Sequence, residues 1–446
     1  MEQRRTRMTQ SIKRPKSLNL SVEQLDSRLA PAVITVTSTS DTVAMDGVVT
    51  LREAIIAANT NRPYMDAPAG DAYTTDIIRF NIPGSGVKTI AVKSALPELT
   101  GPVIIDGTTQ SGYGGTPIIE INGIGAYQTV NGLVVKGGNS TIKGIMVNNF
   151  RGHGIVLDSN DNKVIGCYVG IDYRGIYNQG NRGDGIRVLG SNNQIGGTES
   201  GERNVISGNG GAGVRITGWR GSNNRVEGNH IGTNANGQNS IFNQDGVVIE
   251  NGARHNRIGG TTKAARNIIT GNWTDGVRIT GSSTSHNVVQ GNHIGVDSTG
   301  RAASLSGRDG VRIEGGANNN TIGGATPGAG NLIGGHGTRR VAGQSVGAGI
   351  VIGGFGTTRN IIQGNWLGLN NIASTRIANQ GGGILVQGGA TGNTIGGTTR
   401  AQMNFISDQV NAPGLASTNL ILPPNWFTNS LLYMRNPNAR AGVYVG

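Results

Sequence analysis

Three short phrases recur along most of this 446-residue chain, and the repeat constrains the fold more than any other feature. Glycine followed by alternating apolar residues occurs at Gly132, Gly154, Gly185, Gly213, Gly246, Gly276, Gly310, Gly349 and Gly383. Asn-x-Ile-Gly-Gly begins at Asn193, Asn256, Asn320 and Asn393, and Asn-apolar-Ile begins at Asn204, Asn267, Asn331 and Asn404. The last two phrases recur at the same intervals of 63, 64 and 73 residues. Such a fixed period is typical of solenoids.

The phrases have the alternation of strands. In "GVRI" at 276–279, valine and isoleucine flank an arginine, which places the apolar side chains inward and the arginine outward. Helical spacing is absent from the repeats. Glycine and asparagine between the phrases tolerate left-handed corners. We therefore predict an all-β chain, a single-stranded parallel β-helix with three short strands per coil and coils stacked about 4.8 Å apart.

The composition fits a narrow core. Glycine contributes 76 residues and proline only 13, without a Gly-X-Y period, which excludes collagen. Hydrophobic residues make up 35% and aromatic residues 4%, which is little for a large compact globule but enough for a core threaded along an axis. Cys167 is the only cysteine, so no disulfide forms within the chain. No apolar run of about eighteen residues exists, and no transmembrane helix is expected.

The charge indicates the class of partner. The net charge is +12 and the sequence pI is about 10.1, which favours nucleic acid, acidic polysaccharide or a membrane surface. The first sixteen residues contain Arg4, Arg5, Arg7, Lys13, Arg14 and Lys16, yet the rest of the chain remains basic without them. Nucleic acid is the least favoured partner, because aromatic residues are sparse and no nucleic-acid-binding motif is present.

Several repeated polar residues are expected at corners rather than in chemistry. Stacked side-chain amides form ladders in cross-β chains, and we predict the same here for Asn224, Asn287, Asn360, Asn229, Asn292 and Asn365. Cys167 occupies the equivalent position in an earlier copy and is expected to be a buried thiol. His230 and His293 alternate with Trp366 and Tyr168, so that position requires a flat side chain and not a metal ligand.

The two ends differ from the repeats. Residues 1–31 are a basic, disordered tail in which "LNLSVEQLDSRLAPA" resembles an N-terminal tag of exported bacterial surface proteins. Residues 32–125 are predicted to hold a cap and irregular first coils, and Thr50 with Glu53 forms a capping box before a short helix. The repeats span 126–409, and residues 410–446 cap or trail the other end.

"VTLREAIIAAN", "VIIDGTTQSGYGGTPIIEING" and the "RNVISGN…NRVEGNHIGTNANG" cycle resemble the CSLREA-motif bacterial surface proteins. That resemblance covers about residues 34–409 and implies a right-handed parallel β-helix of the pectin-lyase-like fold, located outside the cell or at its surface. Val49 and Thr50 stand where the motif has Cys and Ser. The resemblance implies no reaction.

A file of acidic residues is the strongest candidate for chemistry. Asp245, Asp275 and Asp309 each precede the strand glycine on consecutive coils. In register, their carboxylates would suit a glycosidase or hold Ca²⁺ as a cofactor. Alternatively, arginines three residues later neutralise them along a solvated face. Strict alternation puts Asp and Arg on opposite sides unless the glycine corner rotates the aspartate.

Four long connections, at 171–183, 233–244, 296–308 and 369–381, precede the glycine phrase and are expected to project on one side. Loops on one face of a solenoid commonly mark its binding side. The predicted ligand-binding residues are Arg187, Arg215, Arg278, Arg312, Tyr173 and Tyr177, with Val248 interrupting the arginine file.

These observations favour a monomeric, structural or adhesive β-helix at the cell surface that binds an acidic polysaccharide or another surface glycan weakly and repeatedly. The alternative is a polysaccharide lyase or glycoside hydrolase acting on an acidic glycan. A lyase requires a defined base and a metal or arginine clamp, whereas the sequence shows only a repeating ladder.

Overall fold

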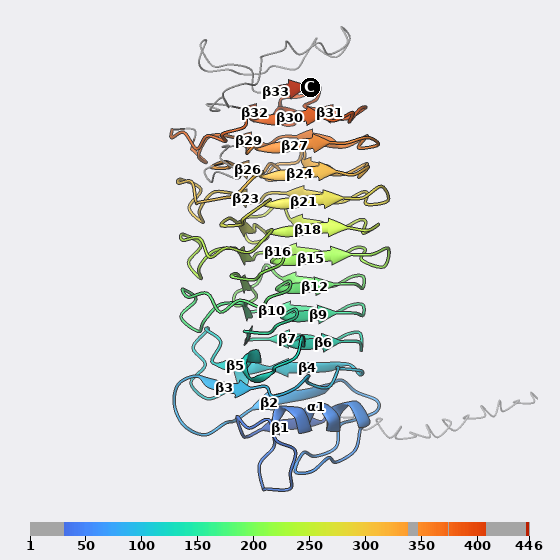
Figure 1. Cartoon of the computed structure of the whole chain (residues 1–446), viewed down its shortest axis with the longest axis vertical. Coiled ribbons are helices and arrows are strands. Elements are labelled where there is room, and N and C mark those ends of the chain that lie inside the picture. Colours follow the sequence, from blue (N-terminus) through green and yellow to red (C-terminus); the bar gives the residue numbers. More distant parts are fainter. Residues whose placement is uncertain (1–30, 338–346, 373, 407–442, 446) are drawn as a thin grey trace, which may run out of the picture. The chain divides into compact units, whose positions relative to one another are not determined.

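The computed structural model describes residues 31–337, 347–372, 374–406 and 443–445, which form three parallel sheets (Figure 1). From residue 103 on, each coil contributes one strand to each sheet, and each strand pairs with the equivalent strand of the next coil. The chain is a right-handed parallel β-helix, which confirms the predicted fold. Within the described residues, no helix is long and apolar enough to cross a membrane.

Sheet 1 contains β1 (Val33–Val36), β2 (Asp76–Phe80), β4 (Val103–Asp106), β7 (Thr141–Lys143), β10 (Lys163–Ile165), β13 (Gln194–Gly196), β16 (Arg225–Glu227), β19 (Arg257–Gly259), β22 (Val288–Gln290), β25 (Thr321–Gly323), β28 (Ile361–Gln363) and β31 (Thr394–Ile395). Sheet 2 contains β3 (Lys88–Ala91), β5 (Ile119–Asn122), β8 (Ile145–Asn148), β11 (Tyr168–Val169), β14 (Val205–Ile206), β17 (His230–Ile231), β20 (Ile268–Ile269), β23 (His293–Ile294), β26 (Leu332–Ile333), β29 (Trp366–Leu367) and β32 (Phe405–Ile406). Sheet 3 contains β6 (Leu133–Val135), β9 (Ile155–Leu157), β12 (Ile186–Val188), β15 (Val214–Thr217), β18 (Val247–Glu250), β21 (Val277–Thr280), β24 (Val311–Glu314), β27 (Ile350–Gly353), β30 (Ile384–Gln387) and β33 (Val443–Val445).

One continuous apolar core runs between the three sheets. Val277 and Ile279 of β21 are fully buried and stack on Val311 and Ile313 of β24. Arg278 lies between the two inward residues and points out, as the alternation predicted. Each coil places branched apolar side chains at the same inward positions. These side chains therefore pack on one another from coil to coil and extend the core along the axis.

Buried asparagines form ladders at the corners. Asn224 donates from Nδ2 to Oδ1 of Asn256 (2.9 Å), which in turn donates to Oδ1 of Asn287 (2.9 Å). The same Oδ1 atoms accept the backbone N–H of the residue one coil earlier, for example from Asn224 to Asn256 (2.9 Å). A second ladder includes Asn229 and Asn292 and begins at Cys167, whose backbone N–H donates to Asn204 (2.8 Å). Both predicted ladders are therefore confirmed.

A third ladder, which the sequence analysis missed, precedes the strands of sheet 3. Asn181 donates from Nδ2 to Asn209 (3.0 Å), and Asn209 donates to Asn243 (3.0 Å). His336 takes an asparagine's place farther along. Its backbone N–H donates to Asn379 (3.2 Å), and its Nε2 faces the carbonyl of Ile294 at 3.3 Å.

The first coil is covered by helix α1 (Leu51–Thr60). Thr50 caps it by accepting from the backbone N–H of Glu53, while the Glu53 carboxylate accepts the N–H of Thr50 at 2.9 Å. Leu51 and Ile55 are fully buried against the core. This confirms the predicted capping box. Three short 3-10 segments, η1 (Gly107–Thr109), η2 (Gly123–Gly125) and η3 (Arg400–Gln402), complete the described helices.

The ends of the chain are described only in part. Residues 1–30, with the export-like tag, and residues 407–442 lie outside the described residues. Near the C-terminus, β33 pairs in parallel with β30, Ile384 opposite Val443.

Replacing His336 with the asparagine of the other coils should stabilise the protein at acidic pH. Burial lowers the pKa of His336 to about 4, whereas histidine in an unfolded chain binds a proton near pH 6.5. The neutral ring of His336 therefore gives its full stabilisation of the folded state above about pH 6.5. Below that pH the unfolded chain binds the proton more readily, so this stabilisation is lost as the pH falls toward 4. We expect His336→Asn to raise the melting temperature more at about pH 5 than at about pH 7.5.

The exposed His286 provides the matched control, because it occupies a left-handed corner where other coils have Asn223 and Asn319. The change in melting temperature caused by His286→Asn should depend less on pH than that caused by His336→Asn, because the ring of His286 is exposed. A His336→Asn effect that does not depend on pH would contradict the assignment.

Candidate functional site

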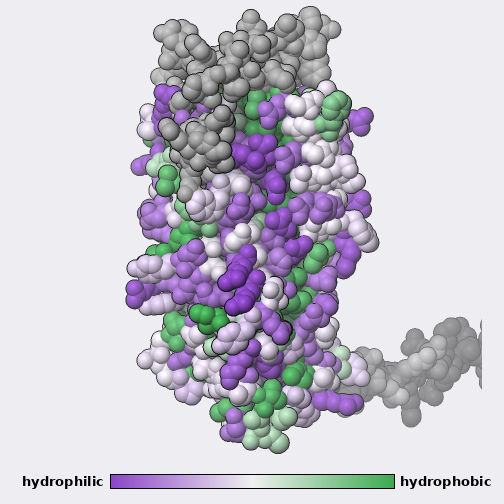
Figure 2. All heavy atoms as spheres, viewed as in Figure 1, coloured by the Kyte–Doolittle hydropathy of each residue, from purple (hydrophilic) through white to green (hydrophobic). Residues whose placement is uncertain are grey.

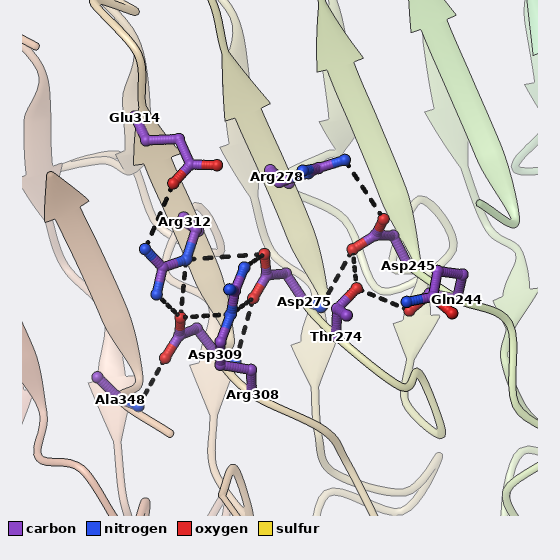
Figure 3. A network of polar contacts seen from close by, with 10 residues as sticks. All are labelled: Gln244, Asp245, Thr274, Asp275, Arg278, Arg308, Asp309, Arg312, Glu314 and Ala348. Carbon is purple, nitrogen blue, oxygen red and sulfur yellow. Dashed lines mark hydrogen bonds and ion pairs between the residues drawn. The ribbon is translucent and has the colours of Figure 1, made fainter. Parts of the chain in front are cut away.

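The predicted acidic residues form a fourth ladder at the edge of sheet 3 (Figure 3). The backbone N–H of Asp275 donates to Oδ1 of Asp245 (3.2 Å), and that of Asp309 donates to Oδ1 of Asp275 (3.3 Å). Asp309 then accepts from the backbone N–H of Ala348 (2.9 Å). Each carboxylate therefore accepts the backbone N–H of the following coil, whereas each asparagine oxygen at the other corners accepts the backbone N–H of the preceding coil. The predicted register of the file is confirmed.

The ladder extends to the earlier coils. Asp184 accepts from the backbone N–H of Ala212 (2.9 Å), and its own N–H donates to Nδ1 of His153 (2.8 Å). The backbone N–H of His153 in turn donates to Oδ1 of Asn131 (2.8 Å). Any side chain with a hydrogen-bond acceptor can thus occupy a position in this ladder. The ladder is interrupted at Ala212, whose side chain has no acceptor.

The arginines lie beside this ladder and not opposite it. Asp and Gly precede the strands, so the corner turns the carboxylate toward the outer face, and the predicted neutralisation of the aspartates by arginines is confirmed. Arg215 donates from Nε to both oxygens of Asp184 (3.0 Å each), and Arg308 donates to both oxygens of Asp275 (3.1 and 2.6 Å). Arg312 bonds the carboxylate of Asp309 (Figure 3).

The arginine file has the predicted register. Arg187 lies opposite Arg215, and Arg278 lies opposite Arg312, with Val248 between the two pairs. Hydrophilic residues run along much of this face (Figure 2). The network sets the guanidinium groups of Arg187, Arg215, Arg278, Arg308 and Arg312 against the carboxylates of Asp184, Asp245, Asp275, Asp309, Glu250 and Glu314. Five cations facing six anions leave no positive excess on sheet 3.

Burial limits what these carboxylates can do. The side chains of Asp275 and Asp309 are 0% and 4% exposed. Burial raises the pKa of Asp275 to about 6 although Arg308 hydrogen-bonds to it. Among the described residues, no three or more His, Cys, Asp or Glu side chains are grouped so that they could hold a metal ion. The Ca²⁺ and catalytic assignments of Asp245, Asp275 and Asp309 stay predictions without a geometric basis here.

The long loops form a second layer over the outer face of sheet 2. Their tips stack through backbone hydrogen bonds: Ala235 N–H donates to Gly175 (2.9 Å), Ser298 N–H to Gly237 (2.9 Å) and Asn371 N–H to Gly300 (2.9 Å). Small apolar clusters fill the space beneath, one around Ile171, Val205 and Ile241 and another around Val296, Leu332 and Ile377. Much of each loop is therefore architectural.

Flat side chains of sheet 2 lie under these loops. His230 and His293 are buried, and Nδ1 of each faces a loop carbonyl at 3.0 Å, that of Ala235 and Asp297 respectively. Burial lowers the pKa of both to about 4. These histidines pack where the sequence analysis expected a flat ring.

The predicted tyrosines remain at the surface of the first loop. Tyr173 and Tyr177 are 43% and 59% exposed. Arg174 donates to the hydroxyl of Tyr173 (2.9 Å). The structure does not bring these tyrosines into the ion network of sheet 3.

The uncompensated charge lies on sheet 1, which the sequence analysis missed. We define the basic face as the outer side of sheet 1 and its flanking turns within the described residues from 220 to 406. Its cations are Arg220, Arg225, Arg254, Arg257, Lys263, Arg266, Arg359 and Arg400. Glu227 is the one acid of this face, and Arg257 pairs with it at 2.7 Å, while Arg220 pairs with Asp158 of an earlier coil at 3.7 Å. The other described acids in this range lie in sheet 3, directly before its strands, or in loop 296–308.

The charges of the basic face are accessible and in register. Lys163, Gln194, Arg225 and Arg257 occupy neighbouring positions of β10, β13, β16 and β19. The side chains of Arg225 and Arg257 are 51% and 39% exposed, against 17% for Arg215 and 13% for Arg312 in the sheet 3 network. The sequence signal that could have revealed the basic face was the distribution of acidic residues, because residues 315–406 contain no Asp or Glu.

Comparison with known proteins places the chain by fold only. No protein-family model and no curated protein matches it. Among solved structures, the Dettilon tailspike protein (gp208) has a TM-score of 0.47 and 14% identity over 91% of this chain, which spans 66% of the tailspike, just under two thirds. The A-module of the Azotobacter vinelandii mannuronan C-5 epimerase AlgE6 has a TM-score of 0.42 and 14% identity, covering 91% of this chain and 96% of the module. The fold of the chain is shown by its own three parallel sheets.

Chelating divalent cations should leave the melting temperature unchanged, because arginines already neutralise the acidic file. Asp275→Asn should lower stability by about 3 kcal/mol with or without chelator, since Arg308 and Arg312 lose a buried partner. Thermal melts of both proteins check this. Destabilisation by chelator that disappears in Asp275→Asn would instead show Ca²⁺ bound at the file.

Proposed function

We propose that this protein is a structural or adhesive β-helix at the cell surface that binds an acidic polysaccharide through the basic face. The observation that carries the proposal is the separation of charge: acids concentrate on sheet 3, where arginines neutralise them, while sheet 1 keeps its cations. A polyanion would therefore be attracted to sheet 1. The arginine file of sheet 3, expected to bind the glycan, is occupied by its own carboxylates.

The geometry favours binding over cleavage. A general acid or nucleophile must contact the glycosidic bond, whereas Asp275 and Asp309 are buried and bonded to arginine. Arg308 and Arg312 are held by the same carboxylates. The lyase or hydrolase alternative therefore lacks an accessible acid and a free arginine clamp in this network.

An extended polymer suits the basic face better than a small anion. The coils repeat about every 4.8 Å, so a chain with regularly spaced carboxylates would meet cations on several coils. Weak contacts of this kind add through multivalency. The strands of sheet 1 from β10 to β31 contain no aromatic residue, whereas single-stranded nucleic acids bind on aromatic platforms.

Removing charge from the basic face should weaken retention on immobilised polygalacturonate. Arg225→Gln combined with Arg257→Gln should elute at clearly lower salt than wild type, because exposed charges act within about 10 Å at 0.1 M ionic strength. Arg187→Gln with Arg278→Gln is the matched control on sheet 3, and thermal melts confirm that both variants fold. The control should elute with wild type.

A shift in the sheet 3 variant alone would return the binding site to the arginine file. Unsaturated sugar products released from the matrix would contradict the non-enzymatic proposal and favour a lyase.

A further inference from the structure

Two exposed aromatic side chains occupy equivalent turns between sheet 3 and sheet 1. Trp219 follows β15 and is 73% exposed, and Phe355 follows β27 and is 90% exposed. Large apolar side chains this open to water keep apolar area that a partner could bury. Because both belong to the same turn of the repeat, the two rings mark a position along the coils and not a random surface site.

Backbone pairing fixes this equivalence. Ser222 bridges Arg254, Arg254 bridges Ser285, and Ser285 bridges Asn318, while the N–H of Asn319 donates to the carbonyl of Thr358 (3.2 Å). Three residues before each bridging residue lie Trp219, Asn251, Ser282, Gly315 and Phe355. The aromatic residues are therefore four coils apart, about 19 Å at 4.8 Å per coil, and the turns between them carry small polar residues or glycine.

The next coil leaves room for each aromatic residue. A Cβ on Gly389 would lie 3.0 Å from Cδ2 of Phe355, so the ring rests against a glycine backbone. A Cβ on Gly252 would lie 3.7 Å from Cα of Trp219. With glycine beside each of them, these aromatic side chains remain largely open to solvent.

The same turns lead into the basic face. Arg220, Arg254 and Arg359 are exposed within them. His255 and His286, on neighbouring coils, stack with ring centroids 4.9 Å apart and an interplanar angle of 21°. Flat rings and cations therefore occur together along one border of sheet 1, from Trp219 to Phe355.

We propose that these turns form a ring-stacking border at which sugar rings of the acidic polysaccharide pack on Trp219 and Phe355 while its carboxylates meet the arginines. This inference rests on the proposed function and adds a subsite for the sugar itself. The apolar C–H face of a pyranose complements the negative face of an aromatic ring. Small residues at the three intervening turns let the polymer lie between the two platforms.

The spacing disfavours single-stranded nucleic acid. Nucleic-acid-binding proteins stack successive bases on neighbouring aromatic side chains. Two platforms about 19 Å apart instead suit a polymer held mainly by its charges and fixed at two points.

The test compares Trp219→Ala with Phe355→Ala as a double variant against Tyr127→Ala, which removes an equally exposed aromatic residue (83%) outside these turns. Binding of an oligogalacturonate and of inorganic polyphosphate, which has charge but no rings, is titrated at several salt concentrations. We expect the double variant to bind the oligogalacturonate about tenfold more weakly. Its affinity for polyphosphate and its salt dependence should match wild type, and Tyr127→Ala should match wild type throughout.

Wild-type affinity of the double variant for the oligogalacturonate would overturn this inference, and the proposed function would stand if Arg225→Gln with Arg257→Gln still weakens binding. Equal losses for both ligands would also overturn it, because polyphosphate cannot stack. Tighter binding of a single-stranded oligonucleotide that depends on Trp219 and Phe355 would replace the polysaccharide with nucleic acid.

Discussion

The β-helix depends on satisfying the backbone N–H groups at its corners, which lie between the strands and outside the regular ladders. A buried donor without a partner costs about 1–3 kcal/mol, and each coil repeats the same donors. Side chains of an adjacent coil meet this requirement in four columns, those of the following coil in three of them and those of the preceding coil in the fourth. Three columns use mainly asparagine, whose amide also donates onward, as from Asn224 to Asn256. The fourth uses His153, Asp184 and the file from Asp245 to Asp309.

The choice of carboxylate in the fourth column determines where the protein keeps its charge. A buried carboxylate requires a counter-ion, and arginines on the outer face of sheet 3 provide it. Those arginines are then neutralised, so the excess positive charge remains on sheet 1. There, the eight cations in the range 220–406 described by the structure face only Glu227 and, at Arg220, Asp158. The need to neutralise buried carboxylates at the edge of sheet 3 thus leaves the excess positive charge, and with it the proposed binding, on sheet 1.

The repeat made much of this structure predictable. Alternation in "GVRI" predicted the inward valines and the arginine register, including the gap at Val248, and asparagine periodicity predicted two ladders. The third ladder was missed because loops of different length separate Asn181, Asn209 and Asn243. Alternation alone left the side of Asp309 open, because the aspartate lies in the turn before the strand and the glycine corner decides whether it faces Arg312. The basic face was missed because residues were compared only at equivalent positions of the repeats. Such a comparison does not show that acidic residues are absent from a whole stretch of the chain.

Arginine-directed chemical modification, with and without bound oligogalacturonate, tests the central claim most directly. Mass spectrometry would report the modification of each arginine in the folded protein. The account predicts that the ligand protects Arg225, Arg254 and Arg257 on sheet 1 and leaves the reactivity of Arg187 and Arg278 on sheet 3 unchanged. Protection confined to Arg187 and Arg278, or no protection at any of these arginines, would contradict it.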